Sequence, residues 1–483
     1  MRQTKLIEAL RSLTTRERNR WRQYVHSDFF NKHELSRRLC DLILAQAPDF
    51  SGKVLEKRQV YPCVFSQEEP YNELKINNLI SDLYELLLSY LAYIRREKDL
   101  IGEQYHSLMA LLERNLDKQA AAALDKYHTL LERRSDRTAE WHRHAMRFWE
   151  AGEMLHSRQP RRTAGEHLRR QAEAQYHAHL FEKMRLSVAM LSRNTLAVVS
   201  PVDTPYWQND LQDFRRDRQL LDDLPFSEVY FAAQELLRQP SPASFTALTT
   251  GLDAHYLQFQ KEEINELYQC ALNYCIRRIN DGQAEAYPDA LALYRTLLER
   301  GLLFQNNRLS QWTYKNIATT GLRSGEYDWT EKFLYTYRDM LLPTERDNAF
   351  AFNLATLYFE KQDFTSALRT LQNVEFTDIT YHVGAKILQL KSFYLLDEPE
   401  ALQSLLDATE KLLRRNKSLS DFGKTTNLNF IMILRQICQW NRKKERLARL
   451  KRKQERMQLL DKATRLHPLA NKDWILRILE EAE

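Results

Sequence analysis

Apolar residues in this chain recur at steps of three and four, the spacing that places side chains on one face of an α-helix. The clearest example lies between residues 71 and 94. Its apolar stripe consists of Ile76, Leu79, Ile80, Leu83, Leu86, Leu87, Tyr90, Leu91 and Ile94. Earlier in the chain, Thr14 and Glu17 have the spacing of a capping box, which marks the start of another helix. These patterns predict helices in the N-terminal part.

The composition extends this prediction to the whole chain. Only 11 Gly and 13 Pro occur among 483 residues, about 5% of the total against an average of roughly 12%. Few tight turns and many helix-forming residues favour long helices joined by short loops. We therefore predict an all-α fold. A chain of this length is too long for one compact core, so we expect several domains or an extended array.

Proline-rich and small polar stretches suggest the boundaries. "SPVDTPYW" at 200–207 is the best candidate for a domain boundary, and "QPSPAS" at 239–244 is the expected turn of a helical hairpin. We predict an N-terminal helical domain (1–98), a middle helical segment (99–200), a helical hairpin leading into repeats (201–263), a repeat array (264–440), and a basic helix followed by a C-terminal capping helix (441–483).

The repeat array rests on a recurring triplet of an Asn, a large residue and a small residue. The triplet occurs at Asn273-Tyr274-Cys275, Asn316-Ile317-Ala318 and Asn353-Leu354-Ala355, at separations of 43 and 37 residues. An aromatic residue and then a small one follow on the next expected helix each time. A small residue where two helices cross lets their backbones approach closely, and one such pair must stack on another to bury its apolar face.

Residues 348–376 resemble a tetratricopeptide repeat. The residues that match that motif are Leu354, Ala355, Tyr358, Phe364, Ala367 and Leu371. The units at 313–342 and 380–413 match less closely, and the second of them has Lys391 where a small residue belongs. The resemblance implies an array of antiparallel helix hairpins, an α-solenoid. The stretches "NYCIRRIN", "KNIATTGL" and "LLRRNKSLS" are similar to those of a family of bacterial helical-repeat proteins, a likeness that implies no activity.

The repeated asparagines are the first candidate binding residues. In tetratricopeptide repeats the first helices line a concave groove, so the resemblance implies that Asn273, Asn316 and Asn353 contact the backbone of a bound peptide there. Lys315 and Arg323 can add positive charge for an acidic ligand. The alternative is that each Asn bonds a neighbouring helix or water.

The second candidate is a basic segment at 442–456, expected to be helical. Its charge is +7, so the rest of the chain carries −1 of the net +6. The cations are Arg442, Lys443, Lys444, Arg446, Arg449, Lys451, Arg452, Lys453 and Arg456. Such a helix can contact nucleic-acid phosphates, an anionic membrane surface or an acidic partner, or it can be a solvated face.

Catalytic and metal-binding motifs are missing from the sequence. It has no P-loop, no G-x-G-x-x-G and no G-x-S-x-G, and its five cysteines form no C-x-x-C pair. His142 and His144, like His177 and His179, are two residues apart rather than the four that a helical zinc site needs. We expect no metal or cofactor, no membrane span, and a soluble cytoplasmic protein with reduced thiols.

From these observations we predict a non-enzymatic scaffold that binds a protein or peptide in the groove of the repeat array. The alternative is a regulatory protein that associates with nucleic acid through residues 442–456. An enzyme is the third class, for which the sequence offers no motif.

Overall fold

The computed structural model describes residues 1, 3–50, 52–66, 68–158, 165–196, 224, 227–372 and 374–481. Within these ranges the regular structure is helical and no strand occurs, so the predicted all-α class is confirmed. The chain divides into two compact units, Met1–Met184 with Leu257–Phe259, and Arg185–Tyr256 with Gln260–Glu483. The predicted boundary near residue 200 lies outside the described residues.

The first unit contains the N-terminal helices and most of the middle segment. Its helices are α1 (Lys5–Ser12), α2 (Thr15–His26), α3 (Glu34–Leu44), η1 (Lys53–Leu55), α4 (Lys57–Val64), α5 (Glu73–Lys98), α6 (Leu100–Glu113), α7 (Asp117–Glu132), α8 (Ala139–Ser157) and the larger part of α9 (Glu166–Leu196). The division between the units falls inside α9, within the predicted middle segment 99–200.

The apolar stripe between residues 71 and 94 is the centre of the N-terminal core. It forms α5, and Ile76, Leu83 and Leu87 on that helix are completely buried against α1, α2, α3 and α4. The predicted capping box is present at α2, where Glu17 N–H donates to the Thr14 hydroxyl at 3.2 Å and Thr14 N–H donates to the Glu17 carboxylate at 2.8 Å. Local sequence signals therefore describe this part of the chain correctly.

The histidines of α8 are structural. His142 and His144 point to opposite sides of α8, as their spacing predicts, and both are buried. The ring of His142 lies 5.1 Å from that of His177 on α9, whereas His144 Nδ1 lies 3.0 Å from the Tyr127 hydroxyl on α7. Burial lowers the pKa of His142 to about 3, so this imidazole stays neutral inside the packing.

The second unit contains the hairpins. Its helices are α12 (Ser227–Arg238), α13 (Pro242–His255), α14 (Lys261–Asn280), α15 (Ala286–Glu299), α16 (Gln311–Arg323), α17 (Tyr327–Tyr337), η3 (Arg338–Met340), α18 (Pro343–Glu360), α19 (Phe364–Gln372), α20 (Ile379–Leu395), α21 (Pro399–Arg415), α22 (Asp421–Lys444), α23 (Arg449–Arg465) and α24 (Lys472–Glu480). A short helix, η2 (Tyr256–Gln258), spans the point after α13 at which residues Leu257–Phe259 are assigned to the first unit. The predicted hairpin is α12 with α13, and its turn spans residues 239–241.

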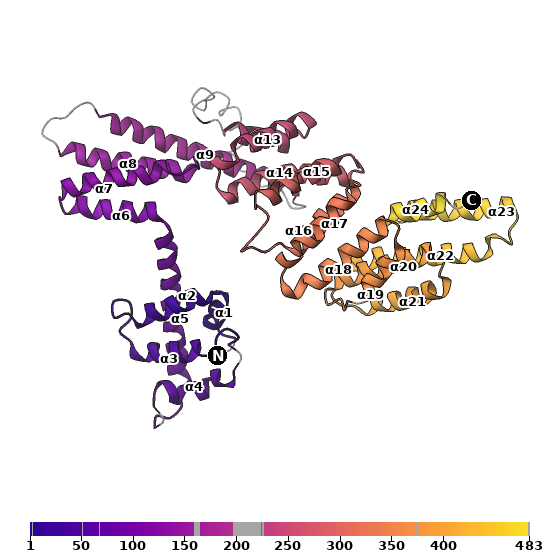
Figure 1. Ribbon diagram of the computed structural model, residues 1–483, viewed down its shortest axis with the longest axis horizontal. Coiled ribbons are helices and arrows are strands. Elements are labelled where there is room, and N and C mark those ends of the chain that lie inside the picture. Colours follow the sequence, from indigo (N-terminus) through magenta and orange to yellow (C-terminus); the bar gives the residue numbers. More distant parts are fainter. Residues whose placement is uncertain are drawn as a thin grey trace. The chain divides into compact units, whose positions relative to one another are not determined.

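Consecutive helices of this unit pack side by side in the part coloured from pink to yellow in Figure 1. Each helix of the predicted repeats contacts the next along the chain, and α16 and α20 also contact α18. The small residues expected at the crossings are buried: Ala318, Ala355 and Ala367 are 0% exposed. At Gly321 on α16 the approach is so close that an added Cβ would lie 2.2 Å from the Thr330 hydroxyl on α17.

The prediction of one basic helix over 442–456 is wrong. Helix α22 ends at Lys444, a turn follows, and α23 begins at Arg449, so the two helices pack against each other as a hairpin. An ion pair of 2.9 Å between Lys443 and Glu455 joins them. The residues of this segment are good helix formers, so its local preference is for one continuous helix. The packing of α22 against α23 overrides that preference. Leu450, at the start of α23, is 72% exposed.

Candidate functional site

The three repeated asparagines lie in three different environments. The side chain of Asn316 on α16 is exposed, that of Asn273 on α14 is half-buried, and that of Asn353 on α18 is 2% exposed. Within the described part of the chain the amides of Asn273 and Asn316 make no hydrogen bond, so each is free to accept or donate one.

Asn353 has a structural role in this fold. Its Nδ2 donates to the Ala349 carbonyl at 2.7 Å, one turn earlier on α18, and its side chain also faces the Tyr381 hydroxyl on α20. A buried amide whose bonds are made inside the helix packing does not present a surface to a ligand. Asn353 is therefore unsuitable as a peptide-binding residue. The alternative, in which the Asn bonds within the helix packing, fits the structure at this position.

The two predicted cations also differ. The Lys315 ammonium is half-buried above three aromatic rings, with Nζ 5.4 Å from the centre of Phe352, 5.8 Å from Tyr381 and 6.0 Å from Trp312. Burial lowers the pKa of Lys315, and Asp378 opposes that shift. Arg323 is exposed at the end of α16, where it lines a small pocket formed with α18, α20 and α24.

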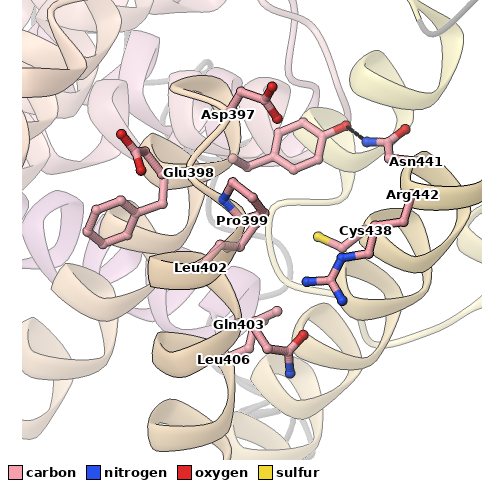
Figure 2. A pocket seen from close by; sticks show the side chains of 11 residues that line it. Asp397, Glu398, Pro399, Leu402, Gln403, Leu406, Cys438, Asn441 and Arg442 are labelled. Carbon is pink, nitrogen blue, oxygen red and sulfur yellow. Dashed lines mark hydrogen bonds between the residues drawn. The ribbon is translucent and has the colours of Figure 1, made fainter.

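The best-formed candidate site in the described residues is a pocket between α20, α21 and α22, with a volume of about 410 Å³. We call it the α21 pocket. Its lining residues are Phe393, Tyr394, Asp397, Glu398, Pro399, Leu402, Gln403, Leu406, Cys438, Asn441 and Arg442. Figure 2 shows the α22 residues Cys438, Asn441 and Arg442 across from Leu402 and Leu406 of α21. A mainly apolar concavity with a few polar groups is typical of a ligand site.

One polar group in the α21 pocket has an unfilled hydrogen-bonding end. Asn441 Nδ2 donates to the Tyr394 hydroxyl at 3.1 Å, the bond drawn as a dashed line in Figure 2. Its Oδ1 is buried and has no partner among the described residues. An unpartnered buried amide oxygen costs free energy. Because this oxygen has almost no accessible surface, it belongs to the wall of the pocket and is not exposed to a ligand there.

The charged groups of the α21 pocket lie at its rim. Asp397 and Glu398 are exposed on the short connection between α20 and α21, and Arg442 is exposed near the end of α22. Arg442 forms no ion pair with any described residue. Cys438 behaves as an apolar wall, because burial raises the pKa of its thiol to about 11 and leaves it protonated at neutral pH. The pocket thus has the means to bind a ligand and lacks an activated thiolate.

Of the residues predicted from the sequence, the structure places only Arg442 in this pocket. Of the other members of the basic segment, Lys443 and Lys444 are the last residues of α22, Arg446 lies on the turn that follows, and the rest lie on α23. Asn441 was missed because a single Asn before a run of cations has no repeat to distinguish it. The adjoining aromatic pair Phe393-Tyr394, placed opposite it by the packing of α20 and α22, gives no signal in the local sequence.

Two other kinds of feature, a metal site and a membrane span, do not occur in the described ranges. No group of three or more His, Cys, Asp or Glu side chains there is arranged to hold a metal ion. None of the helices in those ranges has the length and apolar character needed to cross a membrane.

Comparisons with family models, curated proteins and solved structures give no match to this chain.

Proposed function

We propose that this protein is a non-enzymatic scaffold in which a tetratricopeptide-like array of helix hairpins, from α14 to α22, binds a peptide segment of a partner protein. The observation that carries the proposal is the α21 pocket, an apolar-lined concavity between consecutive hairpin helices with charged groups at its rim. Extended peptides commonly bind helical arrays through side-chain pockets combined with amide contacts to their backbone.

The lining indicates the chemistry of the peptide. Leu402, Leu406 and the ring of Phe393 suit a large apolar side chain, and about 410 Å³ accommodates one aromatic or leucine residue with part of its backbone. Arg442 at the rim suits an acidic residue beside that anchor, because a guanidinium binds a carboxylate through two parallel hydrogen bonds.

A peptide-display selection on the full-length protein tests the proposal. We expect the enriched peptides to share an aromatic or leucine residue next to Asp or Glu. Calorimetry on one such peptide then compares the wild type with Arg442→Glu, and we expect at least a tenfold loss of affinity. Exchanging the acidic residue of the peptide for Lys should restore much of the lost affinity, since the peptide Lys and the glutamate introduced by Arg442→Glu then carry opposite charges.

Arg415→Glu is the matched control, because Arg415 is an exposed arginine at the end of α21 that does not line the α21 pocket. It should leave the affinity within about twofold of the wild type. A selection that enriches nothing, or peptides that bind the Arg442→Glu protein as well as the wild type, would overturn the proposal.

A second candidate function follows from the turn between α22 and α23. Four cations are exposed on this turn and at the start of α23, and they form no ion pair with the described residues. They are Arg446 on the turn and Arg449, Lys451 and Lys453 on α23. Such a cluster can neutralise nucleic-acid phosphates. Anisotropy of a labelled DNA duplex and a labelled RNA should show binding that falls steeply with salt and disappears when all four cations become Gln. A response that is flat in salt removes this function.

A further inference from the structure

A second, smaller pocket of about 150 Å³ is also lined by α20, within the same unit. We call it the Lys391 pocket. Its lining residues are Arg323, Phe359, Glu360, Lys391, Asn471, Asp473, Trp474 and Arg477. They come from the ends of α16 and α18, the C-terminal part of α20, and α24 with the residue before it, and none of them lines the α21 pocket.

Lys391 is the unusual residue of this pocket. Its side chain is 9% exposed and makes no hydrogen bond or ion pair with any described residue. The Nζ atom lies 4.4 Å from the ring centre of Phe359 and 5.5 Å from that of Trp474. The two rings contact the ammonium through cation–π attraction, which fills none of its three N–H donor positions. A buried cation without an acceptor is costly unless something else occupies the site.

Two further cations line the same space. Arg323 and Arg477 are exposed and, within the described residues, neither is ion-paired. The carboxylates of Glu360 and Asp473 also line the pocket, so its formal charge is +1. The effect on Lys391 is a pKa lowered to about 8, mainly by burial, with Arg323 and Arg477 acting in the same direction and Glu360 opposing them.

The start of α24 adds a fourth source of positive potential. This nine-residue helix begins after Asn471, whose backbone is left-handed with φ of 49° and whose side chain makes no capping hydrogen bond in the described structure. The first N–H groups of a helix carry partial positive charge and attract anions. Asn471, Asp473 and Trp474 place that helix start on the wall of the pocket that holds the Lys391 ammonium.

We propose that the Lys391 pocket is a binding site for a tetrahedral oxyanion, a phosphate group, held by the Lys391 ammonium, the Arg323 and Arg477 guanidinium groups and the N-terminus of α24. Such a group presents more acceptor oxygens than a carboxylate does, which suits donors from four separate groups. The volume suits one phosphate group rather than a larger ligand. The exposed arginines form the mouth, so either free phosphate or a phosphate monoester can enter.

Calorimetry on the full chain at low ionic strength tests this site with three probes: inorganic phosphate, O-phosphoserine and acetate. We expect phosphate or phosphoserine to bind and acetate to bind at least tenfold more weakly. Tighter binding of phosphoserine assigns the group to a larger phosphorylated ligand, and tighter binding of phosphate assigns the site to the free ion; both outcomes support the oxyanion site.

Two variants and one control locate the binding. Lys391→Met should abolish phosphate binding, and Arg477→Gln should weaken it at least fivefold. Arg415→Gln, an exposed arginine outside both pockets, should change it by less than twofold. Because Arg477 is exposed, its variant keeps the core intact and the test stands even if Lys391→Met unfolds. Circular dichroism verifies the fold of each variant.

The same titrations contain the results that would overturn the proposal. No phosphate or phosphoserine binding by the wild type, stronger binding of acetate, or equal phosphate affinity in the wild type and Arg477→Gln each contradict it. A pH series with sulfate, which does not titrate in this range, should show affinity falling as pH rises above about 8, as Lys391 loses its proton. The charged groups that face Lys391 in the pocket are Glu360, Asp473, Arg323 and Arg477.

Discussion

The two pockets that α20 lines are opposite in character. The α21 pocket is large and apolar, with its charges at the rim. The Lys391 pocket is small, and three cations line it. The same helix contributes Tyr394 to the first and Lys391 to the second. Residues three positions apart are neighbours on one helix face, so two adjoining sites of different chemistry can share a single helix.

The largest expected effect is on the free energy of unfolding, and it concerns Lys391. Lys391→Met should raise the free energy of unfolding at pH 7 by about 3 kcal/mol, since a pKa lowered from 10.5 to about 8 corresponds to two to three units at roughly 1.4 kcal/mol each. Methionine keeps the contacts with Phe359 and Trp474 and carries no charge. Urea unfolding of the full chain in phosphate-free buffer measures the difference.

The pH dependence of that difference has a definite sign. The unfolded chain holds the Lys391 proton up to about pH 10.5, whereas the folded protein loses it near pH 8. The wild type therefore gains stability, relative to the variant, as pH rises between these values. The advantage of Lys391→Met should be full below pH 8 and gone near pH 10.5. Lys417→Met, at an exposed loop lysine, should show no such change. A constant advantage across this range contradicts the buried, unpaired state of Lys391.

A smaller loss is expected at the α21 pocket. Leu406 is completely buried in the wall of this pocket, and Leu406→Ala should lower the free energy of unfolding by about 2 kcal/mol. The value is at the low end for such a substitution, because the atoms that line a pocket are less densely packed than those of a closed core. A loss near 5 kcal/mol in urea unfolding would show that the space is filled in solution. Leu83→Ala in the closed core around α5 gives that larger reference loss.

The polar contact inside the α21 pocket has a smaller effect again. Tyr394→Phe removes the hydrogen bond with Asn441 and should cost about 1 kcal/mol. It should also weaken a selected peptide, because Asn441 loses the partner that orients its amide. If Tyr394→Phe changes neither urea stability nor peptide affinity, the amide is not held in place as described.

The smallest effects separate the repeated asparagines. Asn316→Ala, on an exposed surface, should change the free energy of unfolding by less than about 0.5 kcal/mol. Asn353→Ala, at a buried amide bonded to the Ala349 carbonyl, should cost about 1 kcal/mol. Thermal unfolding of the two variants side by side tests the assignment, and equal shifts in midpoint would contradict the different roles given to them.

The sequence predicts the helices better than it predicts the sites. The stripe of α5, the Thr14 cap and the small residues at Ala355 and Ala367 depend on local spacing, and the structure confirms them. Local spacing does not predict that the side chain of Asn353 is buried, because the environment of a helix face depends on which other helices pack around it. The break after Lys444 lacks any Gly or Pro signal and arises from packing between α22 and α23.

Lys391 shows how an exception in a pattern can be informative. The sequence placed it where the repeat calls for a small residue, and in the structure it is the buried cation of a pocket. The mismatch alone did not indicate a ligand. The other walls come from α16, α18 and α24, and the cations Arg323 and Arg477 lie 68 and 86 residues away from Lys391 in the sequence. Only the fold brings those cations together.

The most direct test of this account is a crossed titration on the full-length protein. Calorimetry would measure a selected peptide and sulfate against the wild type, Arg442→Glu and Arg477→Gln. The account predicts that Arg442→Glu reduces peptide affinity at least tenfold and leaves sulfate unchanged, while Arg477→Gln reduces only sulfate. If both variants weaken both ligands to the same degree, the α21 pocket and the Lys391 pocket are not separate sites and the account is contradicted.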